Sequence, residues 1–528
     1  MSSITEEVDE IFSEWDRSDS PGCSLAVLKG GEVVYKRGYG MANLEYDVPI
    51  TPRTIFHVAS VSKQFTDFAI AILADEGRLS LDDEVRAHVP ELPDFGEPIK
   101  IRYLVHHTSG IRDQWELLVD AGWRMDDVIT TDDVLELVGR QRELNFRPGS
   151  EYLYCNTGYT LMAVIVERVT GSSLREFCAE RIFEPLGMLD THFHDDQREI
   201  VRGRAYSYSL REGGGFQHSV LSYATVGATS LFTTVEDLAR WDQNFYHAKV
   251  GGRAVVDLVQ TPGVLNDGER LRYAFGLNIG EYRGLRIVEH SGADAGYRSH
   301  LIRFPGQHFS VAVLCNLGAM IPSELTRRVA DAYLADDFPE ERKVVQFMEL
   351  PEEQVARRAG VYYNAPTAST RRLEFKDGRL VLSMRAGIEL LPVAEDRFRP
   401  ANYPMEVSFV DSEETGRPQL RLVMVDNKPV VYEAVDPMKP TNEELSAYTG
   451  DYYSPELDVS YHVGLEGEEL VLRRRKYGSV PLMSTIPDGF AAEGCDLLFH
   501  CDEKGGVTGF RLSSGRIRHL LFTRSSAP

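Results

Sequence analysis

The sequence predicts an α+β domain followed by two antiparallel β domains, with boundaries at residues 1–335, 336–438 and 439–528. Strand-like and helix-like stretches alternate up to about residue 335, which is typical of an α+β domain. After the acidic stretch 336–341, helix signals nearly vanish, and landmarks of the following β-rich segment recur 90 residues later. A chain of 528 residues is also too long for one core, because domains typically run to about 100–200 residues.

The first elements are a hairpin and a helix. Two β-rich runs, 24–28 and 33–35, flank a Gly30-Gly31 turn, which predicts a hairpin. A strand around 55–58 comes next. From about Val61 the apolar residues follow the period of a helix, which we expect to end near Gly77.

Later elements complete the α+β domain. A helix is predicted over 157–167, before Thr170-Gly171. Another is expected to begin at Thr233-Thr234, because a Thr followed three residues later by an acidic residue matches a capping box. Strand character returns at 301–304 and 309–314, on either side of Pro305-Gly306.

Beyond residue 336 the chain repeats itself. Gly360-Val-Tyr-Tyr recurs as Gly450-Asp-Tyr-Tyr, and Leu380-Val-Leu recurs as Leu470-Val-Leu, both at an offset of 90 residues. Short alternating runs broken by glycine turns predict many antiparallel strands in each copy. A unit of about 90 residues with this pattern would close into a small barrel or sandwich.

The composition and charge of the chain exclude some classes of function. The chain holds 57 Lys and Arg against 81 Asp and Glu, and this net charge of −24 would repel nucleic acid. The acidic first residues do not fit a secretion signal, and the apolar stretches fall short of the ~20 residues that span a bilayer. We therefore expect a cytoplasmic protein that binds neither nucleic acid nor membrane.

Six cysteines are scattered without a CxxC pair, so we expect reduced thiols rather than a zinc site or a disulfide framework. Cys495 and Cys501 could face each other across a hairpin, although their spacing is weak support for a bond. The His192-Phe-His194-Asp-Asp196 run resembles part of a zinc signature, but residue 197 is Gln and no second cluster appears. We expect no metal ion and no cofactor.

Ser60-Val-Ser-Lys63 is the first candidate for chemistry. A serine at a helix N-terminus sits in the positive end of the dipole and can offer its own N–H to a developing oxyanion. A lysine three residues later lies one turn away, within reach of the hydroxyl proton. The pattern is common, so an exposed Ser and Lys on a surface helix is the alternative.

Two further triplets follow. Tyr154-Cys-Asn156 comes after the turn residues Arg147-Pro-Gly149, which predicts a loop that could carry catalytic side chains. The alternative interpretation is a turn Asn beside a half-buried Tyr. His290-Ser-Gly292 ends a strand-like run and is followed by small residues, where a backbone could approach a ligand closely. The alternative interpretation is a polar strand end that turns through glycine. Cys155 lacks a supporting His, so a packed thiol is the favoured role.

In this order and context the three triplets resemble the penicillin-recognising serine hydrolases: class C β-lactamases, DD-peptidases, related esterases and D-aminopeptidase. The resemblance extends over about residues 20–335. Its supporting phrases are Phe56-His-Val-Ala-Ser-Val-Ser-Lys-Gln-Phe65, His107-Thr-Ser-Gly110, Arg147-Pro-Gly149, Tyr154-Cys-Asn-Thr-Gly158, Pro185-Leu-Gly-Met188 and the segment 227–241.

The resemblance implies a β-lactamase/transpeptidase-like catalytic domain, with an antiparallel sheet flanked by helices and a helical subdomain. The two β-rich repeats behind it resemble the two antiparallel barrels of bacterial D-aminopeptidase. A loop of the last barrel reaches the catalytic cleft in that enzyme, and the basic run Arg473–Lys476 falls in the matching part of the repeat here. Solvated charges that guard an edge strand are the simpler interpretation of this run.

The resemblance also assigns roles. Ser60 would be the nucleophile that forms an acyl-enzyme, and Lys63 and Tyr154 would share the general base and general acid work. The remaining assignments concern substrate binding. Asn156 would bind the substrate's amide or side chain, and His290 would replace the lysine that usually faces a substrate carboxylate. Gly292 and Ala293 would also contact the substrate, and the N–H groups of Ser60 and Ala293 would form the oxyanion hole.

A histidine is only partly charged near neutral pH, unlike lysine, so the resemblance favours amides, esters or peptides cleaved from the amino end over substrates with a free carboxylate. We therefore expect a serine hydrolase with D-aminopeptidase-like activity, acting on a small-molecule or peptide substrate. A homodimer is the oligomeric state considered. The alternatives are a β-lactamase or D-Ala-D-Ala carboxypeptidase, and a non-catalytic ligand-binding protein on the same fold.

Overall fold

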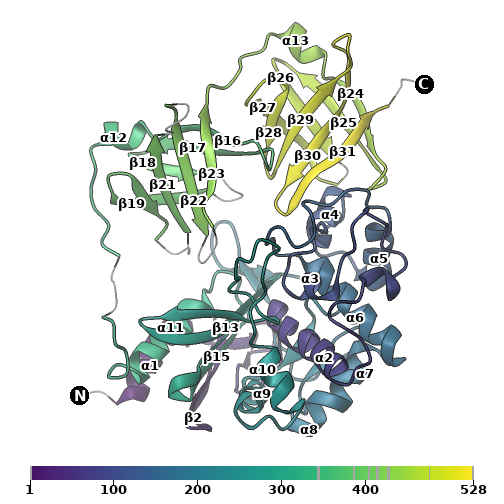
Figure 1. Ribbon diagram of the computed structural model, residues 1–528. Helices are drawn as coiled ribbons and strands as arrows, with labels where there is room; N and C mark the ends of the chain where they lie inside the picture. Colours follow the sequence, from purple (N-terminus) through teal and green to yellow (C-terminus); the bar gives the residue numbers. More distant parts are fainter. Residues whose placement is uncertain are drawn as a thin grey trace. The chain divides into compact units, whose positions relative to one another are not determined.

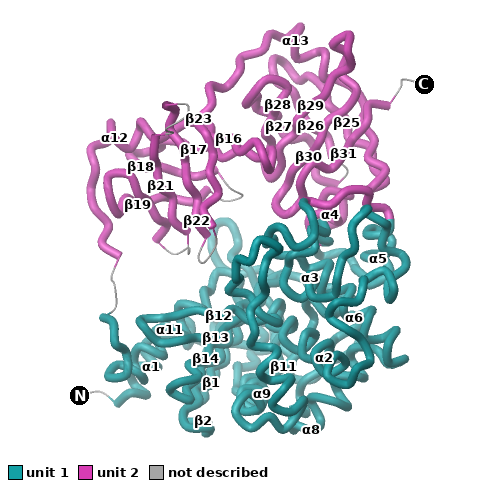
Figure 2. The backbone as a smooth tube through the Cα atoms, viewed as in Figure 1, with its two compact units in different colours: residues 1–114, 125–139, 146–342 teal, residues 115–124, 140–145, 343–528 magenta. Residues whose placement is uncertain are grey.

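The computed structural model describes residues 3–341, 345–383, 387–401, 405–411, 416–424, 428–474 and 476–525. The chain forms two compact units (Figure 2). The first comprises 1–114, 125–139 and 146–342, and the second comprises 115–124, 140–145 and 343–528. The division into three domains at 335/336 and 438/439 stays a prediction.

The first unit is built on a six-stranded antiparallel sheet with the order β12-β13-β14-β15-β1-β2. The predicted hairpin around Gly30-Gly31 is its β1–β2 edge, and the two later strand predictions are β14 and β15. The strands are β1 (Cys23–Lys29), β2 (Glu32–Tyr39), β12 (Asn278–Tyr282), β13 (Leu285–Asp294), β14 (Tyr297–Phe304) and β15 (Phe309–Cys315).

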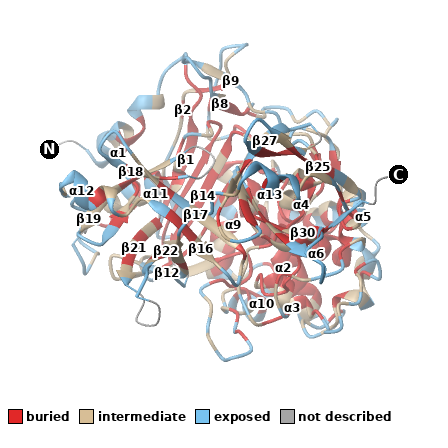
Figure 3. Ribbon diagram, turned by 90° about the horizontal axis from the view of Figure 1, so that it is seen from above, coloured by how far each residue is buried: buried red, intermediate tan, exposed pale blue. Residues whose placement is uncertain are grey.

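Helices cover both faces of this sheet (Figure 1). Helices α1 (Ile4–Phe12) and α11 (Pro322–Tyr333) bury apolar side chains against one face, where alternate residues such as Leu25 and Val27 of β1 meet them. Helix α9 (Val235–His247) contacts β1 and β15, with the side chain of its N-cap Thr234 accepting from the Asp237 N–H as the capping pattern predicts. Buried residues gather along β1, β14 and α2 (Lys63–Asp75) (Figure 3).

The remaining helices of this unit include a long α6 (Asn156–Thr170), which ends at Gly171 in the left-handed conformation. It packs against α2 and α3 (Ile101–Val105), so it belongs to the expected helical subdomain. The other helices are α5 (Thr131–Gly139), α7 (Leu174–Cys178), α8 (Glu184–Leu186) and α10 (Gly252–Leu258).

Short strands of the first unit form four small pairings. In the three-stranded sheet β5-β11-β7, the strand before Ser60 is β5, which pairs with β11. The short strands are β3 (Met41–Asn43), β4 (Val48–Pro49), β5 (Phe56–His57), β6 (Ile129–Thr130), β7 (His192–Phe193), β8 (Tyr208–Leu210), β9 (Phe216–His218), β10 (Tyr223–Ala224) and β11 (Leu231–Thr233).

Two closed eight-stranded antiparallel barrels make up most of the second unit, so the expected barrels are confirmed. Gly360 begins the first strand of one barrel and Gly450 the first strand of the other, and the Leu-Val-Leu landmarks occupy the third strand of each. The 90-residue offset therefore marks structurally equivalent positions.

The first barrel contains β16 (Gly360–Asn364), β17 (Ser369–Lys376), β18 (Arg379–Leu382), β19 (Ile388–Ala394), β20 (Arg397–Arg399), β21 (Met405–Asp411), β22 (Pro418–Met424) and β23 (Val430–Val435). The second contains β24 (Gly450–Ser454), β25 (Val459–Glu466), β26 (Glu469–Arg474), β27 (Gly478–Ser484), β28 (Gly489–Ala492), β29 (Cys495–Cys501), β30 (Val507–Ser514) and β31 (Ile517–Arg524).

The structure adds detail on the segments before the barrels, on the cysteines and on membrane-spanning helices. The acidic segment before each barrel forms a short helix, α12 (Glu352–Ala356) or α13 (Asn442–Ser446). Cys495 and Cys501 lie on the same strand, so the proposed pairing across a hairpin is wrong, and all six cysteines are free thiols. Among the described residues, no helix combines the length and apolar character that crossing a bilayer requires.

Segment 115–124, which includes most of α4 (Gln114–Asp120), clusters with the barrels rather than with the first unit. The Tyr461 hydroxyl donates to the Asp120 carbonyl at 2.6 Å, and the Ser514 hydroxyl donates to the Asp120 carboxylate at 2.6 Å. The basic run 473–476 starts in β26, whose last two residues are Arg473 and Arg474, and Lys476 lies before β27; Arg475 is outside the described residues.

A buried ion pair fastens α9 to the sheet, and we predict that breaking it destabilises the chain. Arg303 of β14 donates to the Asp242 carboxylate of α9 at 2.8 Å, with side-chain exposures of 2% and 1%. Arg303→Met leaves Asp242 buried without its cation and should cost about 3–5 kcal/mol of the free energy of unfolding, whereas Arg303→Met with Asp242→Leu should recover most of the loss. Urea unfolding of the full chain measures both, and a single variant as stable as wild type would contradict the prediction.

Candidate active site

Ser60 lies in a tight turn between a strand and a helix. Strand β5 is followed by a 3-10 turn over Ala59–Ser62, and α2 begins only at Lys63, so the expected helix start near Val61 is two residues early. Ala59 has φ +47°, which is uncommon for a residue other than glycine. The Ser62 hydroxyl donates to the Ala59 carbonyl at 2.5 Å and accepts from the Leu231 N–H at 3.0 Å, which holds the turn.

Lys63 is fully buried and directed at Ser60. Its Nζ donates to Ser60 Oγ at 3.1 Å, to Asn156 Oδ1 at 2.8 Å and to the Ala228 carbonyl at 2.6 Å. An ammonium has three N–H donors, and these three acceptors come from three separate segments of the chain. The arrangement places an amine within proton-transfer distance of a serine hydroxyl.

Asn156 and Tyr154 also lie close to Lys63 Nζ. Asn156 is the first residue of α6, and both its backbone N–H and its Nδ2 donate to Asp113 Oδ2, at 2.7 and 2.8 Å. These contacts turn its Oδ1 toward Lys63. The Tyr154 ring centroid is 4.9 Å from Lys63 Nζ and 4.2 Å from the His107 ring centroid, so the ring is close to the amine.

His290 lies on β13 and is only 4% exposed. Its Nδ1 lies 2.6 Å from the Ser291 carbonyl, which can only accept, so Nδ1 carries the proton and Nε2 accepts from the Tyr273 hydroxyl at 3.0 Å. Burial, together with the charge of Lys63, lowers the pKa of His290 to about 3. The ring is therefore neutral at physiological pH, and a smaller fraction of it is protonated than for an ordinary histidine with a pKa of about 6.5.

Gly292 lets β13 approach the turn that carries Ser60. A Cβ at this position would lie 2.3 Å from the Val58 carbonyl oxygen and 3.0 Å from the Ser60 nitrogen. The Ser299 hydroxyl, from the neighbouring strand, donates to the same Val58 carbonyl at 2.7 Å. Ala293, the next residue, is exposed, so its backbone stands beside the turn at the surface of the unit.

The structure thus brings together all seven predicted residues: Ser60, Lys63, Tyr154, Asn156, His290, Gly292 and Ala293. Sequence reasoning missed Asp113 and the Ala228 carbonyl, which hold Asn156 and Lys63. Asp113 lies three residues after the quoted His107–Gly110 phrase, but neither residue type nor spacing gives it a role. The Ala228 contact uses a backbone carbonyl, for which a sequence carries no signal.

His192, His194 and Glu199 come together although no metal was expected there. Their ligand atoms lie within 4.8 Å of one another. Arg175, however, donates to both oxygens of Glu199, at 2.7 and 2.8 Å, and also to Asp195 at 2.9 Å. The carboxylate of the cluster is thereby already neutralised by a guanidinium.

A cavity of about 340 Å³ lies in the same unit, but the seven predicted site residues do not line it. Its walls include Ser230, Phe232 and Tyr297. The ring centroids of Phe232 and Tyr297 each lie 5.4 Å from that of His57, three residues before Ser60. The candidate active site is therefore defined by the contacts of Ser60 and Lys63 rather than by this cavity.

Curated proteins resemble part of this chain. A D-aminopeptidase from Gluconobacter oxydans (strain 621H) is 30% identical over 300 residues, which cover 57% of this chain and 56% of the relative. A D-aminopeptidase from Brucella canis is 29% identical over 296 residues, 56% of each chain. The chain thus matches little more than half the length of these curated relatives.

Solved structures share the fold. The octameric penicillin-binding protein homologue from Pyrococcus abyssi superposes with a TM-score of 0.57 at 27% identity, over 81% of this chain and 99% of that one. D-amino acid amidase from Ochrobactrum anthropi SV3 gives a TM-score of 0.54 at 21% identity, over 64% of this chain and 100% of that one, a likeness of fold alone.

The family model named Beta-lactamase matches residues 8–336, well over half of the chain and nearly all of the first unit. The match encloses Ser60, Tyr154 and His290, whose side chains the fold gathers around Lys63. The chain belongs to the beta-lactamase family.

Proposed function

We propose that this protein is a serine hydrolase that cleaves amide or ester bonds of small peptides or amino-acid derivatives through an acyl-Ser60 intermediate. The observation that carries the proposal is the 3.1 Å contact between Lys63 Nζ and Ser60 Oγ, with the amine fixed by two further oxygen acceptors. Nucleophile and proton acceptor within hydrogen-bond reach, with the acceptor oriented by other groups, is the general signature of an activated nucleophile.

In the first step Ser60 Oγ attacks the carbonyl carbon of the substrate, and its proton passes to Lys63 as the neutral amine or to Tyr154 as the phenolate, the forms of these groups that can accept one. Collapse of the tetrahedral intermediate breaks the bond to the leaving amine or alcohol, which takes the proton as it departs. Water then attacks the acyl-serine, giving up a proton to the same pair, and the acid product leaves with Ser60 regenerated. The closeness of Lys63 to both Ser60 and the Tyr154 ring supports shared proton transfer.

The backbone N–H groups of Ser60 and Ala293 are the proposed oxyanion hole. Support comes from Gly292, which brings β13 so close to the turn that a methyl group would collide with the Val58 carbonyl. Donors fixed in advance at the place where charge develops are worth about 10²–10³ in kcat.

The relatives named D-aminopeptidase and the neutral state of His290 together favour D-aminopeptidase-like activity on substrates without a free carboxylate at this position. A lysine would attract a carboxylate across the working pH range, whereas the buried imidazole of His290 offers no positive charge. Asn156 and His290 are proposed to line the substrate site, and assembly into a homodimer stays a prediction.

Two alternatives remain. The family match and the penicillin-binding protein homologue favour a β-lactamase or D-Ala-D-Ala carboxypeptidase as the second candidate. A non-catalytic ligand-binding protein on the same fold is the third. The intact contacts of Ser60, Lys63 and Asn156 argue against it, because a site without catalytic work would not need a buried lysine beside a serine.

The first functional prediction is that Ser60 becomes acylated. A fluorophosphonate should add to Ser60 in wild type, and Ser60→Ala should lose labelling and hydrolysis of p-nitrophenyl esters while it keeps the wild-type melting temperature. Ser13→Ala, at an exposed serine of the same unit, is the control and should behave as wild type. Intact-mass and peptide mass spectrometry identify the labelled residue. Labelling elsewhere, or an active Ser60→Ala variant, would sink the assignment, and turnover of a penicillin would favour the second candidate.

The second functional prediction concerns charge on the substrate. For one dipeptide prepared with a C-terminal amide and with a free carboxylate, kcat/KM for the amide should be higher by about tenfold or more, equivalent to about 1.4 kcal/mol. The ratio should stay flat from pH 6 to 9, because a His290 with a pKa of about 3 is neutral throughout that range. A preference for the free acid would refute the argument and favour the carboxypeptidase reading.

A further inference from the structure

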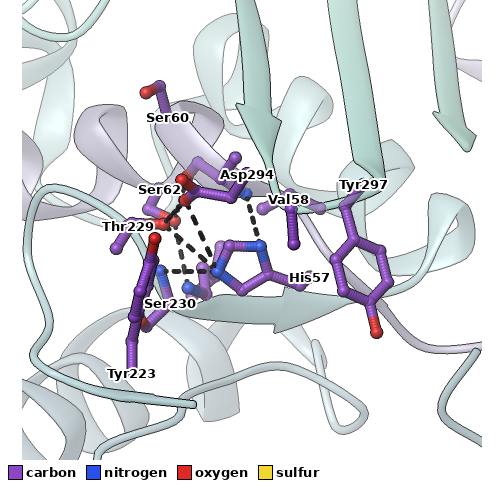
Figure 4. A network of polar contacts seen from close by, with 12 residues as sticks. His57, Val58, Ser60, Ser62, Tyr223, Thr229, Ser230, Asp294 and Tyr297 are labelled. Carbon is purple, nitrogen blue, oxygen red and sulfur yellow. Dashed lines mark hydrogen bonds and ion pairs between the residues drawn. The ribbon is translucent and has the colours of Figure 1, made fainter. Parts of the chain in front are cut away.

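His57 lies directly beneath the turn that carries Ser60 (Figure 4). The residue is 1% exposed, and the ring centroids of Phe232 and Tyr297 each lie 5.4 Å from that of the imidazole. Burial, with the nearby charges of His194 and Arg204, lowers the pKa of His57 to about 3. The imidazole is therefore neutral, with one N–H donor and one nitrogen lone pair.

Two backbone amides compete for that lone pair. The Ala59 N–H points at His57 Nδ1 at 3.2 Å, and the Ser230 N–H points at Nε2, also at 3.2 Å. A neutral ring can accept from only one of them. Which nitrogen carries the proton therefore decides whether Ala59, in its left-handed conformation just before Ser60, has its amide held.

Thr229 decides the question. Its hydroxyl donates to the Asp294 carboxylate, and the same oxygen lies 3.1 Å from His57 Nε2. A hydroxyl has one proton, and donation to a carboxylate is the stronger use of it. Thr229 must then accept from His57, so Nε2 carries the proton and Nδ1 is left to accept from the Ala59 N–H.

This chain of hydrogen bonds connects the two segments on which the proposed oxyanion hole depends. Asp294 ends β13 and directly follows Ala293, and Ala59 directly precedes Ser60. We propose that His57 is a positioning residue, which through Thr229 and Asp294 holds the Ser60 and Ala293 amides in register. The inference rests on the proposed function, since it concerns the hole in which the substrate's oxyanion would form.

The hydrogen-bond chain can be tested without turnover. In ¹⁵N-histidine-labelled protein, the nitrogen chemical shifts of His57 should report a neutral ring with the proton on Nε2. Thr229→Val removes the acceptor and should abolish that preference. Thr326→Val is the matched control, because Thr326 lies 2.7 Å from Nδ1 of the buried His300 in a pair that does not touch Ser60. It should leave the His57 signals unchanged.

Kinetics test the positioning role with two substitutions that each keep one half of the ring's bonding. The Asn side-chain oxygen falls where His57 Nδ1 lies, so His57→Asn can still accept from Ala59, whereas the Gln amide falls where Nε2 lies, so His57→Gln cannot. We expect kcat for an ester to fall about 10–100-fold in His57→Gln with KM nearly unchanged, and His57→Asn to recover most of it.

A thionoester of the same acid separates positioning from loss of stability. Sulfur is a weak acceptor, so a damaged oxyanion hole slows the oxoester more than the thionoester. The oxoester to thionoester ratio of kcat/KM should fall in His57→Gln, and should match wild type in His57→Asn and Thr326→Val. A proton on Nδ1, or a ratio that His57→Gln leaves unchanged, would overturn the inference. Absence of Ser60 labelling in wild type would instead refute the proposed function, and the chemical shifts would still decide the hydrogen-bond chain.

Discussion

The burial of Lys63 is the constraint on which the rest of the site depends. An amine with no exposed surface needs oxygen acceptors, because burial of a charged or polar group without hydrogen bonds costs several kcal/mol. The fold supplies them from the turn at Ser60, from the start of α6 at Asn156 and from the Ala228 carbonyl. Satisfying one lysine therefore fixes three segments relative to one another, and the serine next to the amine is fixed with them.

The sheet performs the complementary task, since it determines how β13 meets the turn. β13 is paired with β12 over residues 285–289 and with β14 over residues 288–294, so its last part, which meets the turn, is held by the β14 ladder. Gly292 removes the one side chain that would hold it away from Val58. The Val58 carbonyl is contacted by two strands of the sheet, because the Ser299 hydroxyl of β14 also donates a hydrogen bond to it. A rigid sheet edge and a tight turn are thus joined through backbone atoms.

Much of this could be predicted from the sequence, because periodicity, glycine turns and the 90-residue offset are local signals. The seven candidate site residues were predicted from motifs whose members are close in sequence. Ser60 and Lys63 are one turn apart, but their closeness to Asn156 and His290 is a tertiary fact that resemblance, not spacing, supplied. The Ala228 carbonyl and the Thr229–His57 contact could not be found in this way. They depend on backbone atoms, proton positions and long-range packing, which leave no pattern in residue types.

The same dependence explains why the third motif behaves differently from a simple exchange of lysine for histidine. Viewed as a residue type, His290 would titrate near neutral pH and give a partial charge. In the structure it is buried, its two nitrogens are occupied by Tyr273 and the Ser291 carbonyl, and the charge of Lys63 opposes its protonation. Protonation would place a second buried cation near the amine and would also break the bond from Tyr273, since Nε2 could no longer accept. The site therefore lacks a cation at this position for a structural reason, and the proposed preference for neutral substrates rests on how His290 is packed rather than on its intrinsic pKa.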